Sequence, residues 1–239
     1  MTSSIRIRIR LGVAALAAVA TTLVGTAALA DTTTTTAPPA RSITERRAFC
    51  IAQIDRRIVA LDARQRELVN AQHLTDDHRA ALNANLDATR DGLRALREQI
   101  RVETDRDAFK AECDSIWTSY RVFALVLPRT HLVTVADTEL YAAGRLTNAS
   151  TRLQQAIDDA KANGKDVTQA QADLDAMEAK VASGQASAAG VPASILSLTP
   201  ADWNANHDVL QPAHDAAQSA RTDLKAAGQL ARQVVADLK

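Results

Sequence analysis

The sequence predicts an all-α protein, in which a signal peptide and a disordered tether precede two coiled-coil bundles of antiparallel helical hairpins. First, apolar residues recur at alternating steps of three and four from Ile43 onward, which is the spacing of coiled-coil helices. Second, residues typical of helix starts and stops divide this pattern into stretches of helical length. Third, the apolar positions of neighbouring stretches come opposite one another when the chain reverses at these breaks, as antiparallel packing requires.

Residues 1–30 have the pattern of a secretory signal peptide. Three arginines precede an apolar stretch at 11–29, and Ala28 and Ala30 place small residues before a cleavage site at Asp31. A retained membrane anchor is the alternative interpretation, but the apolar stretch is short for a span and no stop-transfer flank follows it. We therefore expect an extracytoplasmic protein, secreted or associated with the cell envelope, with no stable membrane span after cleavage.

Residues 31–41 form a low-complexity linker of Thr, Ala and Pro. Such a segment has too little apolar surface to bury, so we expect it to be a disordered and rather extended tether. Threonine-rich segments of exported proteins can carry O-linked sugars, and the sequence leaves open whether this one does.

Residues 42–128 are expected to form the first helical bundle. One apolar seam runs up to the break at His73, and a second begins after Thr75, a residue suited to capping a helix. The two seams fall into register if the chain reverses near residue 75, which predicts an antiparallel hairpin. Thr104 is expected to cap a third helix. The seam positions are Ile51, Ile54, Ile58, Leu61 and Leu68 in the first helix and Leu82, Leu86, Leu93, Leu96 and Ile100 in the second.

Cys50 and Cys113 are the two cysteines of the chain. An oxidising compartment favours their pairing, and the expected hairpin places them at similar heights along the bundle. Two free buried thiols are the alternative. The sequence contains no C-x-x-C motif, so we expect a disulfide between Cys50 and Cys113 rather than a metal site.

The stretch from Trp117 to Ala136 is the most apolar part of the chain after the signal sequence and is expected to join the two bundles. The helical step continues through it, yet residues 121–127 are also β-branched, aromatic and bounded by Pro128, as in a short buried strand. Periodicity cannot decide between helix and strand for so short a run, and both remain open. We expect Pro128 to end or kink the preceding helix.

Residues 129–239 are expected to form a second, Ala-rich bundle of three helices. Asn163-Gly164 predicts the end of the first of these helices. The run Thr199-Pro200-Ala201-Asp202 predicts the start of the last, with a capping threonine, a proline in the first turn and an acid three residues after the cap. Because the apolar spacing continues from Trp203 to Leu238, we expect that last helix to be uninterrupted. A reversal of the chain near residue 200 would place Gly184 opposite Ala217.

Four polar residues at the tip of the first hairpin are the only metal-ligand candidates in the sequence, namely His73, Asp76, Asp77 and His78. Imidazole and carboxylate groups brought together there would suit a divalent ion. The same residues are also what an ordinary capped helix start contains, and we favour that interpretation. A second cluster, Trp203 with His207 and His214, has the spacing of one helical face and is interpreted as an aromatic seal at the end of a bundle.

No motif for catalysis or cofactor binding is present. The sequence lacks a nucleophile elbow, a Gly-rich phosphate loop and an H-E-x-x-H helix. Its carboxylates lie on the flanks of heptads beside arginine, where they usually form a solvated surface. We therefore expect a protein that is not an enzyme and has no catalytic residues and no cofactor.

The charges are nearly balanced, with 28 Lys and Arg against 28 Asp and Glu. A near-neutral chain has no general attraction for nucleic acid or anionic lipid, so nucleic acid is not an expected partner. The distribution is uneven, because residues 41–129 carry a small excess of bases whereas residues 130–239 carry nine bases against thirteen acids.

Several features together resemble a known class of proteins. These are the Ala-rich signal, the Thr/Pro tether, the segment from Tyr120 to Pro128, and the segment from Leu198 to Trp203. In these features the chain is similar to the secreted, Ala- and Arg-rich helical proteins of high-GC actinobacteria. The resemblance covers most of the chain and implies an exported all-helical protein, but it implies no activity and no site residues.

Taken together, these patterns favour an exported, non-enzymatic coiled-coil protein that acts at the cell envelope as a scaffold, a spacer or a binder of protein partners. Its partners would dock through exposed helical seams and include further copies of the chain. A small-ligand or metal-binding helical module is the alternative, and a wall-associated hydrolase is a lesser one.

Overall fold

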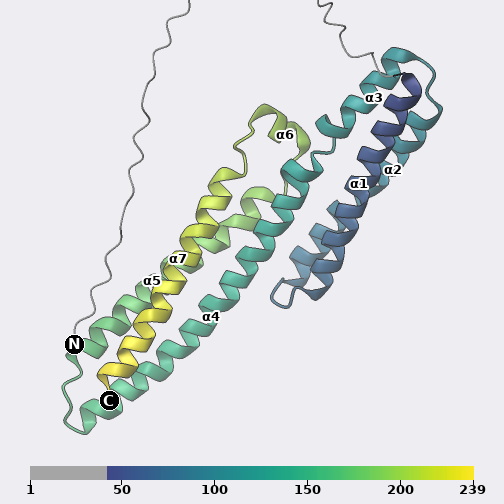
Figure 1. Cartoon of the computed structure of the whole chain (residues 1–239). Helices are drawn as coiled ribbons and strands as arrows, with labels where there is room; N and C mark the ends of the chain where they lie inside the picture. Colours follow the sequence, from purple (N-terminus) through teal and green to yellow (C-terminus); the bar gives the residue numbers. More distant parts are fainter. Residues whose placement is uncertain (1–41) are drawn as a thin grey trace, which may run out of the picture. The chain divides into compact units, whose positions relative to one another are not determined.

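The computed structural model describes residues 42–239, so the expected signal peptide at 1–30 and linker at 31–41 lie outside the described residues. Within the described part, 86% of the residues are helical and none lies in a strand, which confirms the all-α prediction. Figure 1 shows a helical hairpin beside a longer helix, α4, which runs alongside two further helices, α5 and α7.

The first two helices, α1 (Ile43–Asn70) and α2 (Asp76–Val102), form the expected antiparallel hairpin. Thr75 caps α2 as predicted, because its side chain accepts a hydrogen bond from the His78 amide. The register is close to the predicted one. Polar pairs mark it along the hairpin, namely Arg97 with Asp55 at 2.9 Å, Arg90 with Asp62 at 3.1 Å and Gln65 with Asp87 at 3.0 Å.

The third helix, α3 (Arg106–Thr118), lies against this hairpin and carries the disulfide. Cys50 of α1 and Cys113 of α3 are bonded, with 5.7 Å between their Cα atoms, which confirms the predicted pairing. The predicted cap was one residue early. Asp105 caps α3, because its carboxylate accepts from the amides of Asp107 and Ala108.

The chain turns sharply between α3 and the next helix. Arg121 has a φ of 44°, in the left-handed region, and is the only non-glycine residue with positive φ in the described part. Directly after it, a single π-helical turn, η1 (Val122–Val126), leads without a break into α4 (Leu127–Ala162). Residues 122–127 are therefore helical and the strand alternative is wrong, whereas Arg121 lies outside both helices. Pro128 is the second residue of α4 and follows the π turn, in which the Leu127 amide donates to the Val122 carbonyl.

The second half contains α5 (Thr168–Ile195), the short α6 (Pro200–Ala205) and α7 (Gln211–Asp237). The predicted stop at Asn163-Gly164 is confirmed, since Gly164 has a φ of 78° and the Lys165 amide donates to the Ala160 carbonyl at 3.1 Å. The predicted capping box between Thr199 and Asp202 is also present.

The last helix differs from the prediction, which had it uninterrupted from Pro200. The chain leaves the helix at Asn206 and starts again at Gln211, with Pro212 in the first turn of α7. Pro212 has no amide hydrogen to donate to a preceding turn, so a helix begins there more readily than it continues through it. The longer connection shifts the register of α5 on α7. A Cβ atom on Gly184 would lie 2.9 Å from Cγ of Leu224, whereas the predicted neighbour was Ala217.

The buried apolar residues fall into two clusters, and α4 contributes to both. The first cluster is built by α1, α2, α3, η1 and the beginning of α4, together with the last residues of α5 and the first turns of α7. The second is built by the remaining parts of α4, α5 and α7. The expected boundary at 128/129 lies within the first turn of α4, and the division of the chain into two bundles there stays a prediction.

Candidate functional site

The hairpin-tip residues that the sequence singled out contact α4. His73 stacks on Tyr141 with 3.7 Å between ring centroids, and Nδ1 of His78 lies 2.9 Å from both carboxylate oxygens of Asp137. Asp76 and Asp77 are in the first turn of α2, where the helix dipole favours acids. Across residues 42–239, no three His, Cys, Asp or Glu side chains converge in a way that could hold a metal ion.

Asp137 fastens the hairpin tip to α4, and sequence reasoning missed it. Its side chain is fully buried. Besides the contact with His78, its Oδ2 accepts a hydrogen bond from the Thr75 amide at 2.8 Å. The carboxylate therefore satisfies the amide of the residue that caps α2. Two adjacent apolar residues, Val135 and Ala136, precede Asp137, and a buried acid is not expected from such a context.

Replacement of Asp137 by Ala should lower the free energy of unfolding by about 3 kcal/mol. The change leaves the Thr75 amide and the His78 ring without their buried acceptor, and an unsatisfied buried partner costs more than the bond itself contributes. Urea denaturation followed by circular dichroism measures the change. Hydrogen exchange at the Thr75 amide should accelerate at the same time.

The matched control is Asp137→Asn, which keeps a carbonyl oxygen for the Thr75 amide and should cost less than Asp137→Ala. Asp91→Ala, at an exposed position of α2, should change the free energy of unfolding by less than about 0.5 kcal/mol. Equal losses for Asp137→Ala and Asp91→Ala would show that the buried carboxylate does not hold the tip.

The second predicted cluster is brought together only in part. Trp203 packs on His207 with 4.1 Å between ring centroids, and the Arg121 guanidinium lies 4.2 Å from the Trp203 ring. Asn204 joins the same contact, because it accepts from Nε of Arg121 at 2.6 Å. These residues fasten α6 to the turn after α3. His214 instead lines a hollow between α4 and α7 together with His131.

That hollow is one end of a groove between α4 and α7. Helix α5 packs closely against both of these helices, whereas α4 and α7 contact each other less. Three hollows of about 530, 710 and 770 Å³ follow one another along the two helices, and neighbouring hollows share lining residues. From His131 to Arg152 on α4, the groove is about 31 Å long at 1.5 Å per residue.

The floor of the groove is apolar and combines alanines with larger leucines and valines. It repeats every seven residues, so each helix presents the same face to the groove along its length. The repeating floor residues are Ala142 with Ala149 and Leu146 with Leu153 on α4, and Ala217 with Leu224 and Ala231 on α7. Small residues leave the backbone of both helices close to the surface, so an occupant can approach them closely.

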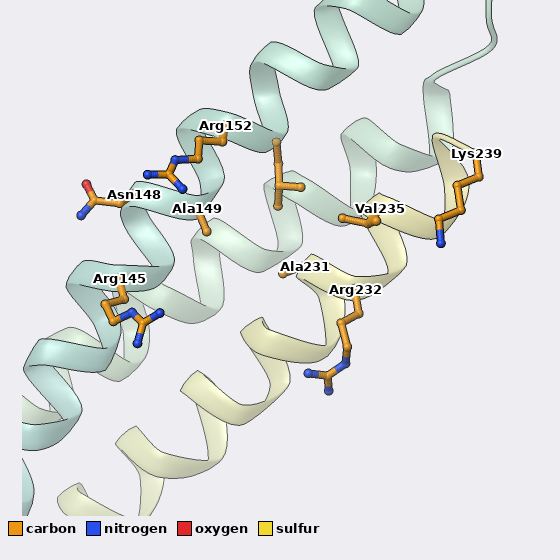
Figure 2. A pocket seen from close by; sticks show the side chains of 9 residues that line it. Arg145, Asn148, Ala149, Arg152, Ala231, Arg232, Val235 and Lys239 are labelled. Atoms are coloured by element: carbon orange, nitrogen blue, oxygen red, sulfur yellow. The ribbon is translucent and has the colours of Figure 1, made fainter.

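The rims of the groove are basic. Figure 2 shows Arg145 and Arg152 on α4, Arg232 on α7 and Lys239 just after the end of α7, around the apolar residues Ala149, Ala231 and Val235. The helical cations share the seven-residue spacing of the floor, with Arg145 and Arg152 on α4 and Lys225 and Arg232 on α7. Arg221 continues this rim on α7.

The groove concentrates positive charge in the half of the chain that is acidic as a whole. It holds six of the nine bases between residues 130 and 239, but Glu139 is its single acid among the thirteen of that half. Glu139 lies 3.7 Å from Arg221. For the other five rim cations, no carboxylate in the described part of the chain forms an ion pair.

On the first hairpin, several arginines are paired with acids. Arg90 pairs with both Asp62 and Asp87, and Arg97 pairs with Asp55. The acids around Arg90 outweigh its burial and raise its pKa, and the largest cause is the hydrogen bond that Arg90 donates to the Asp62 carboxylate. Other arginines of α1, such as Arg56 and Arg66, form no ion pair with a described carboxylate either. The groove is distinguished by the gathering of five such cations around one apolar floor.

The sequence contained a signal for the groove that our reasoning did not use. The heptad spacing of the cations can be read directly in each helix, but the two rows lie some seventy residues apart in the chain. Only the fold shows that they border the same hollow. The net acidic charge of residues 130–239 also pointed away from an anion-binding surface.

Comparison with known proteins finds no matching family model, no similar curated protein and no similar solved structure. Among the described helices, none combines the length and the apolar character needed to cross a membrane.

Proposed function

We propose that this chain is an exported, non-enzymatic helical protein that acts as a scaffold by binding a helix of a partner protein in the α4–α7 groove. The observation that supports the proposal most directly is the groove itself, with its apolar floor between rims that carry five unpaired cations. An amphipathic helix is an occupant that matches such a surface over its whole length.

The dimensions of the groove favour a helix of about twenty residues, which is also about 31 Å long. Such a helix would pack on α4 and α7 as the fourth member of a bundle. It would cover the half-buried leucines of the floor, Leu146 and Leu153, and remove apolar area from water. The alanines of the floor allow the short distance between helix axes that this packing requires.

Two features support export. The signal-peptide pattern of residues 1–30 predicts it, and the disulfide between Cys50 and Cys113 suits an oxidising compartment. A location at the cell envelope would place the groove where it can meet other exported proteins.

A small amphipathic anion is a second candidate occupant, and the widest hollow favours it. This hollow of about 770 Å³ brings Arg145, Arg152, Arg232 and Lys239 around an apolar floor, and its size is within the range of small-molecule pockets. It is open along its length, and the apolar floor continues well beyond it, so a helix uses the surface more fully.

The proposal is tested by a photo-crosslinking amino acid at Ala149, on the floor of the groove, in the cells that export the protein. The control position is Ala179, exposed on the outer face of α5. We expect a discrete crosslinked protein from position 149 and none from 179, with the crosslink mapped to a helical segment of the partner. No adduct, or the same adducts from both positions, would contradict the proposal.

A further inference from the structure

We infer that the partner helix is acidic, with carboxylates repeated every seven residues along both flanks of its apolar stripe. The inference rests on the proposed function and specifies the partner of the same groove. It follows from the spacing of the rim cations, from their lack of acidic partners, and from the positive sign of both rims.

The spacing of the cations is that of a coiled-coil partner. Arg145 and Arg152 on one rim, and Lys225 and Arg232 on the other, are each seven residues apart. A helix lying between the rims repeats its own flanking positions with the same period of about 10.5 Å. Glutamates at these positions would each meet a cation, and both flanks must be acidic because both rims are basic.

The chain itself does not contain this helix. Within residues 42–239, the amphipathic helices already bury their apolar stripes in the two core clusters, so a second copy has no free stripe of this kind to offer. Residues 1–41 contain a single acid, Asp31, and cannot supply the repeated carboxylates. The complementary helix is therefore not found within residues 1–239.

The floor distinguishes an acidic helix from other anions. The lining residues include no Phe, Tyr or Trp on which bases could stack, so the groove lacks the platform of single-stranded nucleic-acid sites. A purely charged polymer would leave the floor uncovered. An apolar stripe with acidic flanks satisfies the floor and both rims together.

The test begins with a display library of single helices that share a leucine stripe and have randomised flanking positions, selected on the full chain. We expect Glu and Asp to be enriched at flanking positions seven residues apart. The affinity of a selected peptide is then measured by fluorescence anisotropy. It should fall as salt is raised, because the rim contacts are exposed to solvent.

Charge-reversal variants then locate the contact. Reversal of three rim cations in Arg145→Glu, Arg152→Glu and Arg232→Glu should weaken the selected peptide by about tenfold or more, and a peptide with Lys in place of Glu should bind this variant instead. The matched control is Arg46→Glu, Arg56→Glu and Arg66→Glu, which changes the net charge equally on exposed positions of α1. The control should bind the acidic peptide as the native chain does.

The outcomes separate the inference from the proposed function. In one outcome, the selected helices have neutral or basic flanks and bind the Ala149→Trp variant more weakly than the native chain. This result would overturn the acidic partner but leave helix binding in the groove intact. No selected helix weakened by Ala149→Trp would overturn both. Polyglutamate and anionic lipid vesicles are tested as competitors beside an unlabelled selected helix. If either displaced the peptide as effectively as that helix, the occupant would be a polyanion or a lipid surface, and the inference would be wrong.

Discussion

Reduction of the disulfide between Cys50 and Cys113 is expected to lower the free energy of unfolding by about 4 kcal/mol. The bond joins residues 63 positions apart and so removes much of the freedom of the unfolded chain. It also fastens the first turns of α1 to the middle of α3. Both cysteines are buried, with Cys50 4% and Cys113 7% exposed, so the disulfide is part of the packed interior of the first three helices.

The effect is measured as the shift of the urea midpoint between oxidised protein and protein treated with reductant. The double variant Cys50→Ala and Cys113→Ala is the control, because reductant should leave its midpoint unchanged. An unchanged midpoint of the native chain in reductant would contradict the expected contribution. Labelling of both thiols in the exported protein without reductant would contradict the bond itself.

The first hairpin could be predicted because its determinants are local. A cap at Thr75 and two apolar seams define where the chain reverses and which residues then face one another. The pairs Arg97 with Asp55 and Arg90 with Asp62 confirm that register within a few residues. Regular heptads predict the facing residues because a helix presents the same face every seven residues, or about two turns.

The junction and the last helix could not be predicted in the same way. Residues 121–127 are too short for periodicity to separate helix from strand, and the π turn depends on the left-handed Arg121. In the second half, the apolar heptad continues through the break at Asn206. Pro212 indicated the new start, but the uninterrupted spacing of alanines and leucines outweighed it in our interpretation.

The groove was missed for a different reason, which is that it depends on how α4 and α7 diverge. Both helices bury alanines against α5, and the sequence does not show which of three helix pairs in a bundle packs least closely. The buried polar contacts were missed for a related reason. Asp137 and Arg129 are charged residues next to apolar ones, and charged residues are rarely fully buried, so a surface position is expected for both.

Arg129 connects three parts of the fold. Its side chain is 2% exposed and donates hydrogen bonds to the amide oxygen of Asn85 on α2 and to the carbonyl oxygen of Leu198 before α6. No carboxylate among residues 42–239 forms an ion pair with it. Burial lowers the pKa of Arg129, and the guanidinium nevertheless keeps its charge because arginine starts from so high a value.

Replacement of Arg129 by Ala is expected to lower the free energy of unfolding by about 3 to 5 kcal/mol. The change leaves two acceptors, the Asn85 amide and the Leu198 carbonyl, without their donor, and it empties the space of a large buried side chain. Urea denaturation measures the loss, and hydrogen exchange should rise around Leu198 before α5 itself opens.

Arg145→Ala is the matched control, because it removes the same residue type from an exposed position of the same helix and should cost less than about 0.5 kcal/mol. Arg129→Lys should fall between the two, since a lysine keeps the charge but lacks the planar fork that reaches two acceptors at once. If Arg129→Ala cost no more than Arg145→Ala, the link between α2, α4 and Leu198 would rest on apolar packing alone. A large loss with partial recovery by Lys would instead assign the link to hydrogen bonds from the buried guanidinium.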